Sequence, residues 1–317
     1  MLSAPSRPVS SIPPWLLYVI CVVIWGSSWY GIRQQLGVVS PQVSLSYRFL
    51  LAAVILLAFC AVTRRSLRFP LRAHIFMALQ GLFLFCGNYI LFYYAGMHVV
   101  SGLLAVCFST MSVMNIFNLA VIFRQKIDRR ALLAALIGLA GIGLVYYPEF
   151  LRPELGGNPM LGLGLSLLAT YLASLGNMVS VKLKAFQIPV LESNTVGMAY
   201  GALFCVGFAL LTQAPFIYDW RLSYSISLGC LAVFATVIGF GCYLTLVQQI
   251  GADRAAYSSV MFPIVALTLS TLLENYSWSP LAGIGVALVL FGNLLVLTRR
   301  RSSPVPLPAT VLSSSQR

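Results

Sequence analysis

The 317-residue chain is 59% hydrophobic and only 9% charged, and its net charge is +13. Because a soluble domain carries about 25% charged residues to coat its surface, this composition excludes a water-soluble globular protein. It also excludes intrinsic disorder, which requires low hydrophobicity, so most of the surface must face lipid.

A helix needs roughly 20 apolar residues to cross a bilayer core about 30 Å thick. Ten such runs follow one another along the chain, separated by turn and charge signals: 15–32, 42–62, 73–95, 99–123, 131–147, 159–181, 193–212, 224–247, 253–273 and 278–298. The alternating strands of a membrane β-barrel are absent. We therefore predict an all-α integral membrane protein with ten transmembrane helices, a cytoplasmic N-terminal tail over 1–14, and a basic, then disordered, cytoplasmic tail over 299–317.

The basic residues predict the orientation. Sixteen of the twenty Lys and Arg residues fall on the side of the N-terminus, three fall on the opposite side, and Arg48 lies inside a span. Since cytoplasmic loops carry an excess of Lys and Arg, we expect a multi-pass protein of the plasma (inner) membrane with both termini in the cytoplasm. The basic residues lie in clusters of two to four between apolar runs, which indicates a lipid bilayer rather than nucleic acid as the partner.

An internal repeat is also indicated. Sliding the chain by 151 residues places Gly141 on Gly292 and Ser112 on Pro263. Five helices is an odd number, so a second copy of a five-helix unit must enter the bilayer upside down. We predict two inverted five-helix repeats, over 15–147 and 159–298, an arrangement in which secondary transporters place the substrate near the bilayer midplane.

Short motifs occur in a characteristic order through the two halves. The first half contains Trp25-Gly26-Ser27-Ser28, Ser40-Pro41, Tyr47-Arg48-Phe49-Leu50-Leu51-Ala52-Ala53, Asn88 and Ser101-Gly102-Leu103-Leu104-Ala105. The second half contains Gly251-Ala252-Asp253-Arg254-Ala255-Ala256, Phe262-Pro263-Ile264, Leu273-Glu274 and a closing helix from Gly283 to Gly292. In these motifs the chain resembles the drug/metabolite transporter (DMT) superfamily, in its ten-helix EamA-type branch.

The resemblance implies export or exchange of small organic solutes across the plasma membrane. Known members handle amino acids, other metabolites and drugs, so the fold leaves the substrate open. Two positions depart from the family pattern: Phe123-Arg124-Gln125-Lys126 stands where a Glu often ends the fourth helix, and Ser112 stands where a Pro often lies within it. We therefore expect the first half to bend differently from the second.

Arg48 is the clearest candidate for a functional charge, because an ionisable group inside a span is costly. It lies about a turn and a half into the second helix from the outer side. Two interpretations are open: a fixed positive charge that binds a substrate carboxylate, or a long side chain that reaches back to the outer interface.

Glu274 ends the ninth helix and is a candidate for gating or coupling, although an acid at a helix end is more often structural. The other acidic residues are expected in loops. Because no carboxylate lies in the middle of a span, a proton relay of buried acids is not predicted. Facilitated diffusion, or coupling through a less obvious group, is preferred.

Several other polar and aromatic side chains are expected to line a cavity or to join helices, since an amide in hydrocarbon needs a partner. With Arg48 they form the candidate substrate-binding set: Trp25, Asn88, Tyr89, Asn115, Tyr171, Asn177 and Tyr243. The alternative for each amide is a hydrogen bond between helices with no contact to substrate. Trp25 is predicted to lie too deep for an interfacial anchor.

The function predicted from these features is a secondary transporter that moves small organic metabolites, with export of amino acids or similar solutes preferred. A channel-like facilitator or a multidrug exporter of the same fold is the alternative. No catalytic motif appears, and neither a metal site nor a cofactor is predicted. The G-x-x-x-G pair Gly197 and Gly201 permits close helix contact within a monomer or in a homodimer.

Overall fold

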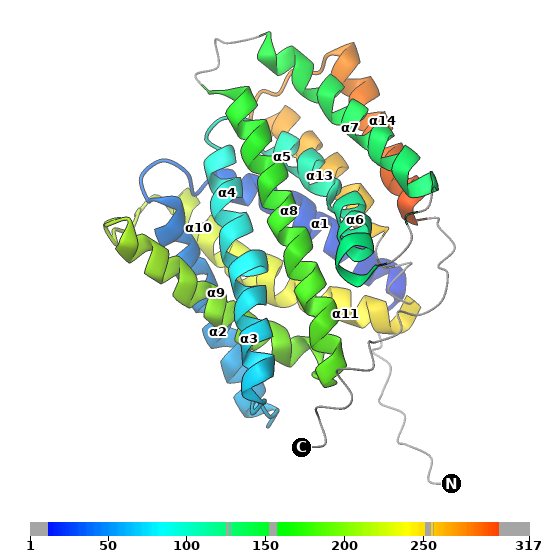
Figure 1. The fold of residues 1–317 in the computed structure, drawn as a ribbon. Coiled ribbons are helices and arrows are strands. Elements are labelled where there is room, and N and C mark those ends of the chain that lie inside the picture. The colour runs from blue at the N-terminus through cyan, green and yellow to red at the C-terminus, as the bar shows by residue number, and fades with distance from the viewer. Residues whose placement is uncertain are drawn as a thin grey trace.

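The computed structural model describes residues 12–124, 127, 129–151, 157–250, 255 and 257–297. Every regular element in these ranges is a helix (Figure 1). The elements are α1 (Pro14–Arg33), α2 (Pro41–Val62), α3 (Leu71–Gln80), η1 (Gly81–Gly87), α4 (Asn88–Ala95), α5 (Ser101–Ser109), α6 (Met111–Phe123), α7 (Arg129–Phe150), α8 (Pro159–Leu183), η3 (Lys184–Phe186), α9 (Val190–Leu211), α10 (Leu222–Cys230), η4 (Leu231–Ile238), α11 (Gly239–Ile250), α13 (Ser258–Leu273) and α14 (Pro280–Leu297).

Within the described ranges, eight helical segments are long and apolar enough to cross a membrane, and this confirms the predicted all-α membrane class. Two further apolar helices, Ser258–Leu273 and Pro280–Leu295, are shorter and coincide with the last two predicted runs, so the count of ten spans stays a prediction. The predicted tails lie outside the described residues, apart from residues 12–14.

Proline residues mark the start of several helices. Pro14, Pro41 and Pro159 occupy the first turn of α1, α2 and α8, where a missing N–H costs no hydrogen bond. Pro70 and Pro189 come directly before α3 and α9. The start of α9 at residue 190 is earlier than the predicted residue 193, and this brings the acidic residue 192 into the helix.

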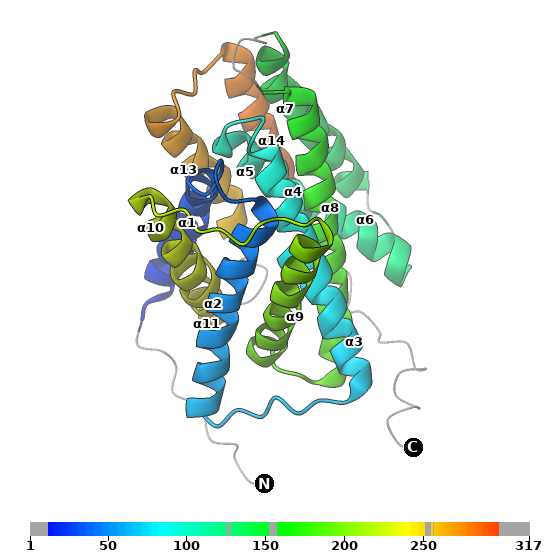
Figure 2. The ribbon, with the colours of Figure 1, turned by 90° about the vertical axis from the view of Figure 1, so that its left-hand side faces the viewer.

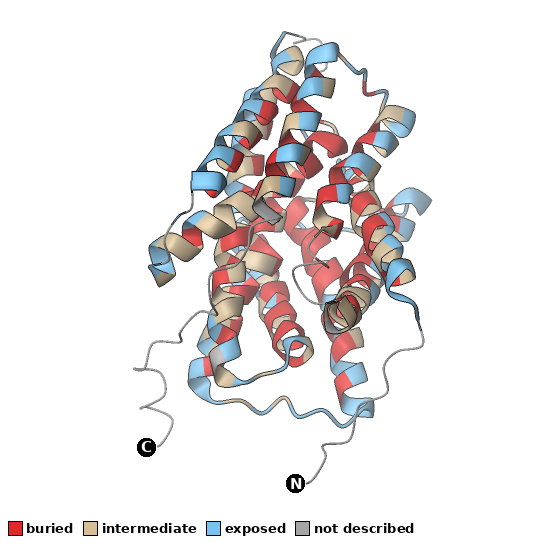
Figure 3. Ribbon diagram, turned by 90° about the vertical axis from the view of Figure 1, so that its right-hand side faces the viewer, coloured by how far each residue is buried: buried red, intermediate tan, exposed pale blue. Residues whose placement is uncertain are grey.

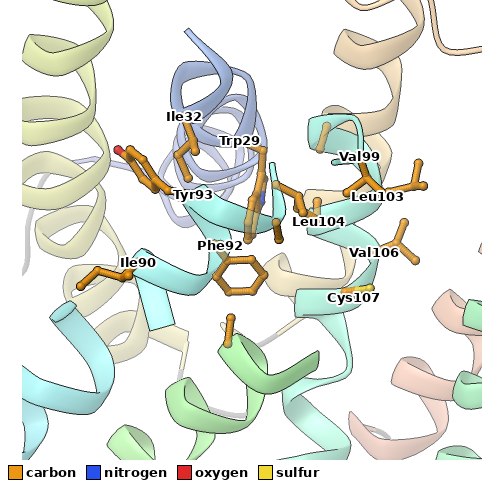
Figure 4. Packing of buried hydrophobic residues seen from close by; sticks show 14 of the residues in the cluster. Trp29, Ile32, Ile90, Phe92, Tyr93, Val99, Leu103, Leu104, Val106 and Cys107 are labelled. Atoms are coloured by element: carbon orange, nitrogen blue, oxygen red, sulfur yellow. The ribbon is translucent and has the colours of Figure 1, made fainter. Parts of the chain in front are cut away.

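Side chains on the outside of the bundle are apolar, as lipid requires. Figure 3 shows buried residues on the inward faces of the helices and exposed residues on their outward faces. The inner core joins α1, α4 and α5 around Trp29, Phe92 and Leu104 (Figure 4). Leu136 on α7 and Leu203 on α9 are 58% and 60% exposed, respectively. Because lipid tails are as apolar as Leu, this exposure costs little in a bilayer.

Two spans contain a π-helical stretch in which hydrogen bonds join residues five apart. They are η1, between α3 and α4, and η4, between α10 and α11. The two stretches begin 150 residues apart, at Gly81 and Leu231. Such stretches are rare and occur frequently at functional sites.

The segment from Ser101 to Phe123 is broken at Thr110 into α5 and α6. The hydroxyls of Ser109, Thr110 and Ser112 each donate to the carbonyl three residues back, at 2.6, 2.6 and 3.2 Å. Back-bonding of this kind bends helices. In contrast, α13 is continuous through Pro263. The two halves therefore differ at this helix as expected, and the break lies in the first half, which has no proline at this position. Figure 2 shows the far end of α6 at the edge of the bundle.

Helices α7 and α14 lie side by side at backbone contact (Figures 1 and 2). A Cβ added at Gly141 would lie 2.6 Å from the carbonyl oxygen of Gly285, and one added at Gly285 would lie 2.6 Å from the oxygen of Gly141. A Cβ added at Gly292 would lie 2.9 Å from the carbonyl oxygen of Ala134. Ala134 on α7 thus contacts Gly292 on α14, and Gly141 on α7 contacts Gly285 on α14. Residue numbers rise along α7 while those of the contacted residues on α14 fall, so the two helices run antiparallel.

The pair Gly197 and Gly201 packs α9 against α3 and η1 within the chain. A Cβ added at Gly81 would lie 2.6 Å from the carbonyl oxygen of Gly197 and 2.7 Å from the amide nitrogen of Gly201. These close contacts lie within one chain.

Candidate functional site

Arg48 lies inside the bundle, on the second turn of α2. It is 2% exposed, so it does not reach back to the interface. Its guanidinium carbon is 4.6 Å from the ring centre of Tyr89 on α4 and 5.3 Å from that of Phe49. Aromatic faces attract a cation, more strongly when water is excluded. Tyr89 and Arg48, both predicted site residues, are therefore brought together.

Among the residues that the structure describes, Arg48 has no carboxylate partner. The ion pairs in the part of the chain that the structure describes are Arg65–Glu192 and Arg221–Asp219. The Nε and Nη1 atoms of Arg48 are buried and have no hydrogen-bond partner. A buried charge without an opposite charge costs several kcal/mol, which makes this arrangement exceptional.

Tyr93 and Gln35 complete the surroundings of Arg48 and were not singled out from the sequence. Tyr93 is fully buried on α4 and interacts with Arg48, and its hydroxyl donates to Gln35 Oε1 at 2.5 Å. Gln35 is 1% exposed and its Nε2 has no hydrogen-bond partner. Figure 4 shows the Tyr93 hydroxyl pointing away from Trp29 and Leu104. The signal in the sequence was a polar Gln directly after the first predicted span, 15–32.

Trp25 and Tyr243, two more predicted site residues, are in contact, with ring centres 5.2 Å apart. Trp25 Nε1 donates to the carbonyl oxygen of Ala235 at 2.9 Å. Ala235 lies in η4, where Gly239 N–H bonds to Phe234, five residues back. Where the five-residue spacing of η4 changes to the four-residue spacing of α11, the carbonyl of Ala235 receives no N–H from its own helix. The Trp25 side chain supplies the donor for this carbonyl.

A series of ring contacts joins the Trp25 and Arg48 groups. Trp25 contacts Phe240 at 5.4 Å, Phe240 contacts Phe85 at 6.4 Å, and Phe85 contacts Phe49 at 5.9 Å between ring centres. These rings come from α1, α11, η1 and α2. Both π-helical stretches therefore lie next to the predicted site residues.

Asn115 and Asn177 are joined between α6 and α8. Ser174 Oγ donates to Asn115 Oδ1 at 2.8 Å, and Asn177 Nδ2 lies 3.4 Å from the same oxygen. Asn118 Nδ2 donates to Ser174 at 2.9 Å. These hydrogen bonds join α6 to α8, as expected of polar side chains that hold helices together.

The two remaining predicted site residues are Asn88 and Tyr171. Asn88 is buried at the start of α4, and its Oδ1 accepts from the N–H of Tyr89 at 2.7 Å. Tyr171 is 39% exposed on α8 and is not brought together with the other candidates.

Glu274 binds the start of another helix. Its Oε2 accepts from the backbone N–H of Ser101 at 2.9 Å, and its Oε1 accepts from the Ser101 hydroxyl. Ser270, also on α13, accepts from the N–H of Gly102 at 2.8 Å. The first amides of a helix lack internal partners, so α13 supplies the cap that α5 does not have in its own sequence.

Glu274→Ala is therefore expected to destabilise the protein by about 1–2 kcal/mol, because the loss of a helix cap costs this much. Thermal unfolding in detergent measures the effect, and Glu274→Gln, which keeps one acceptor oxygen, should lose less. A variant Glu274→Ala that melts like the wild type but loses the pH dependence of transport would support a coupling role instead.

Glu192 corrects the expectation that the acids other than Glu274 lie in loops. It lies in the first turn of α9, is 5% exposed, and its Oε1 pairs with Arg65 Nη1 at 2.9 Å. Glu149 likewise lies in α7. Near Glu192, Gln80 Nε2 donates to Asn194 Oδ1 at 3.1 Å. Pro189 directly before the helix was the signal that could have placed Glu192 inside it.

Comparison with known proteins finds a family of membrane transporters. The model of the EamA-like transporter family matches residues 13–147 and again residues 160–298. The chain is 27% identical over 298 residues to the uncharacterized inner membrane transporter YedA of Escherichia coli K12, covering 92% of this chain and 94% of YedA. It is 24% identical over 287 residues to a probable amino-acid metabolite efflux pump of the same strain, covering 87% and 92%. A solved crystal structure, described only as that of a protein, is similar with a TM-score of 0.62 at 16% identity over 89% of this chain and 95% of that one, which shows the fold.

Proposed function

The chain belongs to the EamA-like transporter family, and we propose on that basis that it is a secondary carrier that exports small organic metabolites across the plasma membrane. The family membership makes the protein a multi-pass membrane transporter and not an enzyme. The substrate class, the direction and the mechanism are the parts that we propose.

Two inverted five-helix repeats are the proposed architecture. The family model matches the chain twice, which supports a duplication. The close contacts of α7 and α14 further support a duplication, because a shift of 151 residues aligns Gly141 with Gly292 and Ala134 with Gly285. The contact Gly141–Gly285 thus maps onto Gly292–Ala134, the reciprocity expected of two units related by a two-fold axis.

Alternating access is proposed in preference to an open pore. The observation that carries this proposal is the burial of Arg48, which is 2% exposed although it lies roughly 10 Å along α2 from its start. An open channel would leave such a charge in contact with water. A closed centre is the occluded conformation that a carrier passes through between its two open states.

Amino acids or similar solutes are the proposed substrates, with both termini in the cytoplasm. The relative named as an amino-acid metabolite efflux pump supports the substrate class. Basic residues at the turn between α2 and α3 and at the end of α8 support the orientation, because such clusters favour the cytoplasmic side.

Counterflow in proteoliposomes tests the carrier. Vesicles loaded with an unlabelled amino acid should transiently accumulate the labelled compound, because a carrier exchanges solute and a pore only equilibrates it. A scan of amino acids, organic acids and cationic drugs selects the substrate. Equal leakage of all compounds without counterflow would support a pore, and counterflow of drugs alone would support a multidrug exporter.

A further inference from the structure

We propose that Arg48 and Gln35, arranged around Tyr93, form the site that binds the carboxylate group of the transported metabolite. This inference rests on the proposed carrier function. It selects, among small organic metabolites, those that carry a carboxylate.

The first support is an excess of hydrogen-bond donors without acceptors. Arg48 Nε and Nη1 and Gln35 Nε2 are all buried without a partner. Tyr93 links the two side chains, because it interacts with Arg48 and donates to Gln35 Oε1 at 2.5 Å. Buried polar groups are nearly always paired, so three unpaired donors at one place indicate a missing acceptor.

The second support is the charge of Arg48. A guanidinium stays protonated at every relevant pH, so this site cannot escape the cost of burial by losing a proton. The Tyr89 and Phe49 rings stabilise the cation, but by less than the cost of its burial. A carrier must also be stable without bound substrate. The aromatic rings stabilise the Arg48 charge but leave its N–H donors free to bind substrate, whereas a fixed Asp or Glu would occupy them.

The chemistry favours a carboxylate over a phosphate. A phosphate group carries about −1.5 to −2 charges at neutral pH and is bound by clusters of Arg. Apart from Arg254, the second residue of the run 253–273, Arg48 is the single Lys or Arg within a predicted span. One positive charge with an additional amide donor matches the single negative charge and the two acceptor oxygens of a carboxylate.

The first test measures ligand binding by thermal stabilisation of the purified protein. The probes are amino acids and N-acetyl amino acids, each compared with its primary amide. Wild-type protein should be stabilised by at least one carboxylate and not by the matched amide, because a ligand that binds the folded state raises its stability. The Arg48→Gln variant should lose this stabilisation, whereas the exposed control Arg72→Gln should keep it.

The melting temperature without ligand separates binding from a structural role. Arg48→Gln removes an unpaired buried charge, so the empty variant should melt at the wild-type temperature or above it. A purely structural Arg48 predicts a lower melting temperature and unchanged ligand stabilisation, and this result would overturn the proposal. Gln35→Leu should weaken carboxylate binding less than Arg48→Gln does, since it removes a neutral donor.

Counterflow in proteoliposomes then distinguishes a failure of the proposed carboxylate site from a failure of the proposed carrier function. Arg48→Gln should raise the carboxylate concentration needed for half-maximal counterflow by roughly 10- to 100-fold, as expected for the loss of charge-assisted hydrogen bonds. Arg48→Lys should retain part of the affinity. Wild-type counterflow of a carboxylate that persists in Arg48→Gln would refute the carboxylate site alone, whereas absence of wild-type counterflow for every compound would refute the carrier.

Discussion

Gly141→Val should prevent stable assembly of the bundle, because it separates α7 from α14. The nearest atom to an added Cβ at this position is a backbone oxygen, that of Gly285, at 2.6 Å. A backbone atom cannot change rotamer, so the helices must move apart along their whole contact. Overpacking usually costs about 1–3 kcal/mol, and we expect the upper end or more here. Thermal unfolding and size-exclusion chromatography in detergent measure the loss.

The same helix offers a matched control. Gly143 is exposed, and a Cβ added there meets no atom within 4 Å, so Gly143→Val should unfold like the wild type. Gly283→Val is the corresponding control on α14. The Gly141→Ala and Gly285→Ala changes should together cost less than the sum of their separate effects, because the same helix displacement relieves both. Strict additivity, or equal loss in the controls, would contradict the backbone contact.

Gly81→Val should be the second strongly disruptive change. A Cβ added at Gly81 would lie 2.6 Å from the Gly197 carbonyl oxygen and 2.7 Å from the Gly201 amide nitrogen. The resulting displacement of α9 should also change transport, because Gly81 begins the π-helical stretch that contains Phe85. We expect a destabilisation of about 3 kcal/mol and loss of most counterflow activity.

Gly207→Val is the control for this contact, because Gly207 lies on α9 and an added Cβ meets nothing within 4 Å. It should preserve both stability and counterflow. If G-x-x-x-G mediated dimerisation instead, Gly201→Val would change the oligomeric state without lowering the melting temperature of the monomer. The structure predicts the opposite, since a Cβ at Gly201 would meet the Phe85 Cβ at 2.6 Å within the same chain.

The positions of the helices could be predicted well from hydropathy. The predicted run 42–62 corresponds to α2 at Pro41–Val62, and the run 193–212 corresponds to α9 at Val190–Leu211. Apolar length alone carries this information, because a bilayer demands a minimum run of apolar residues. The break at Thr110 and the π-helical stretches could not be predicted in this way, since both depend on hydrogen bonds that leave hydropathy unchanged.

The direction of each side chain was harder to predict than the helix that carries it. In a soluble helix the apolar face points inward, whereas here both lipid and core are apolar and the pattern is lost. Tyr171, predicted to line a cavity or to join helices, is 39% exposed, while Tyr93, which was not singled out, is fully buried beside Arg48. Arg48 itself was identifiable because a charge within a span is rare in any orientation.

The π-helical stretches affect more than their own turns. Each of η1 and η4 spaces its hydrogen bonds by one residue more than an α-helix, so the side chains that follow are turned by roughly 100°, the angle of one residue. Tyr89 and Tyr93 follow η1, and Tyr243 follows η4. A relative that lacked one residue in either stretch would keep the identity of every one of these tyrosines and still orient them differently inside the bundle. If these tyrosines line the proposed substrate path, specificity can diverge through helix length without the exchange of any amino acid that contacts substrate.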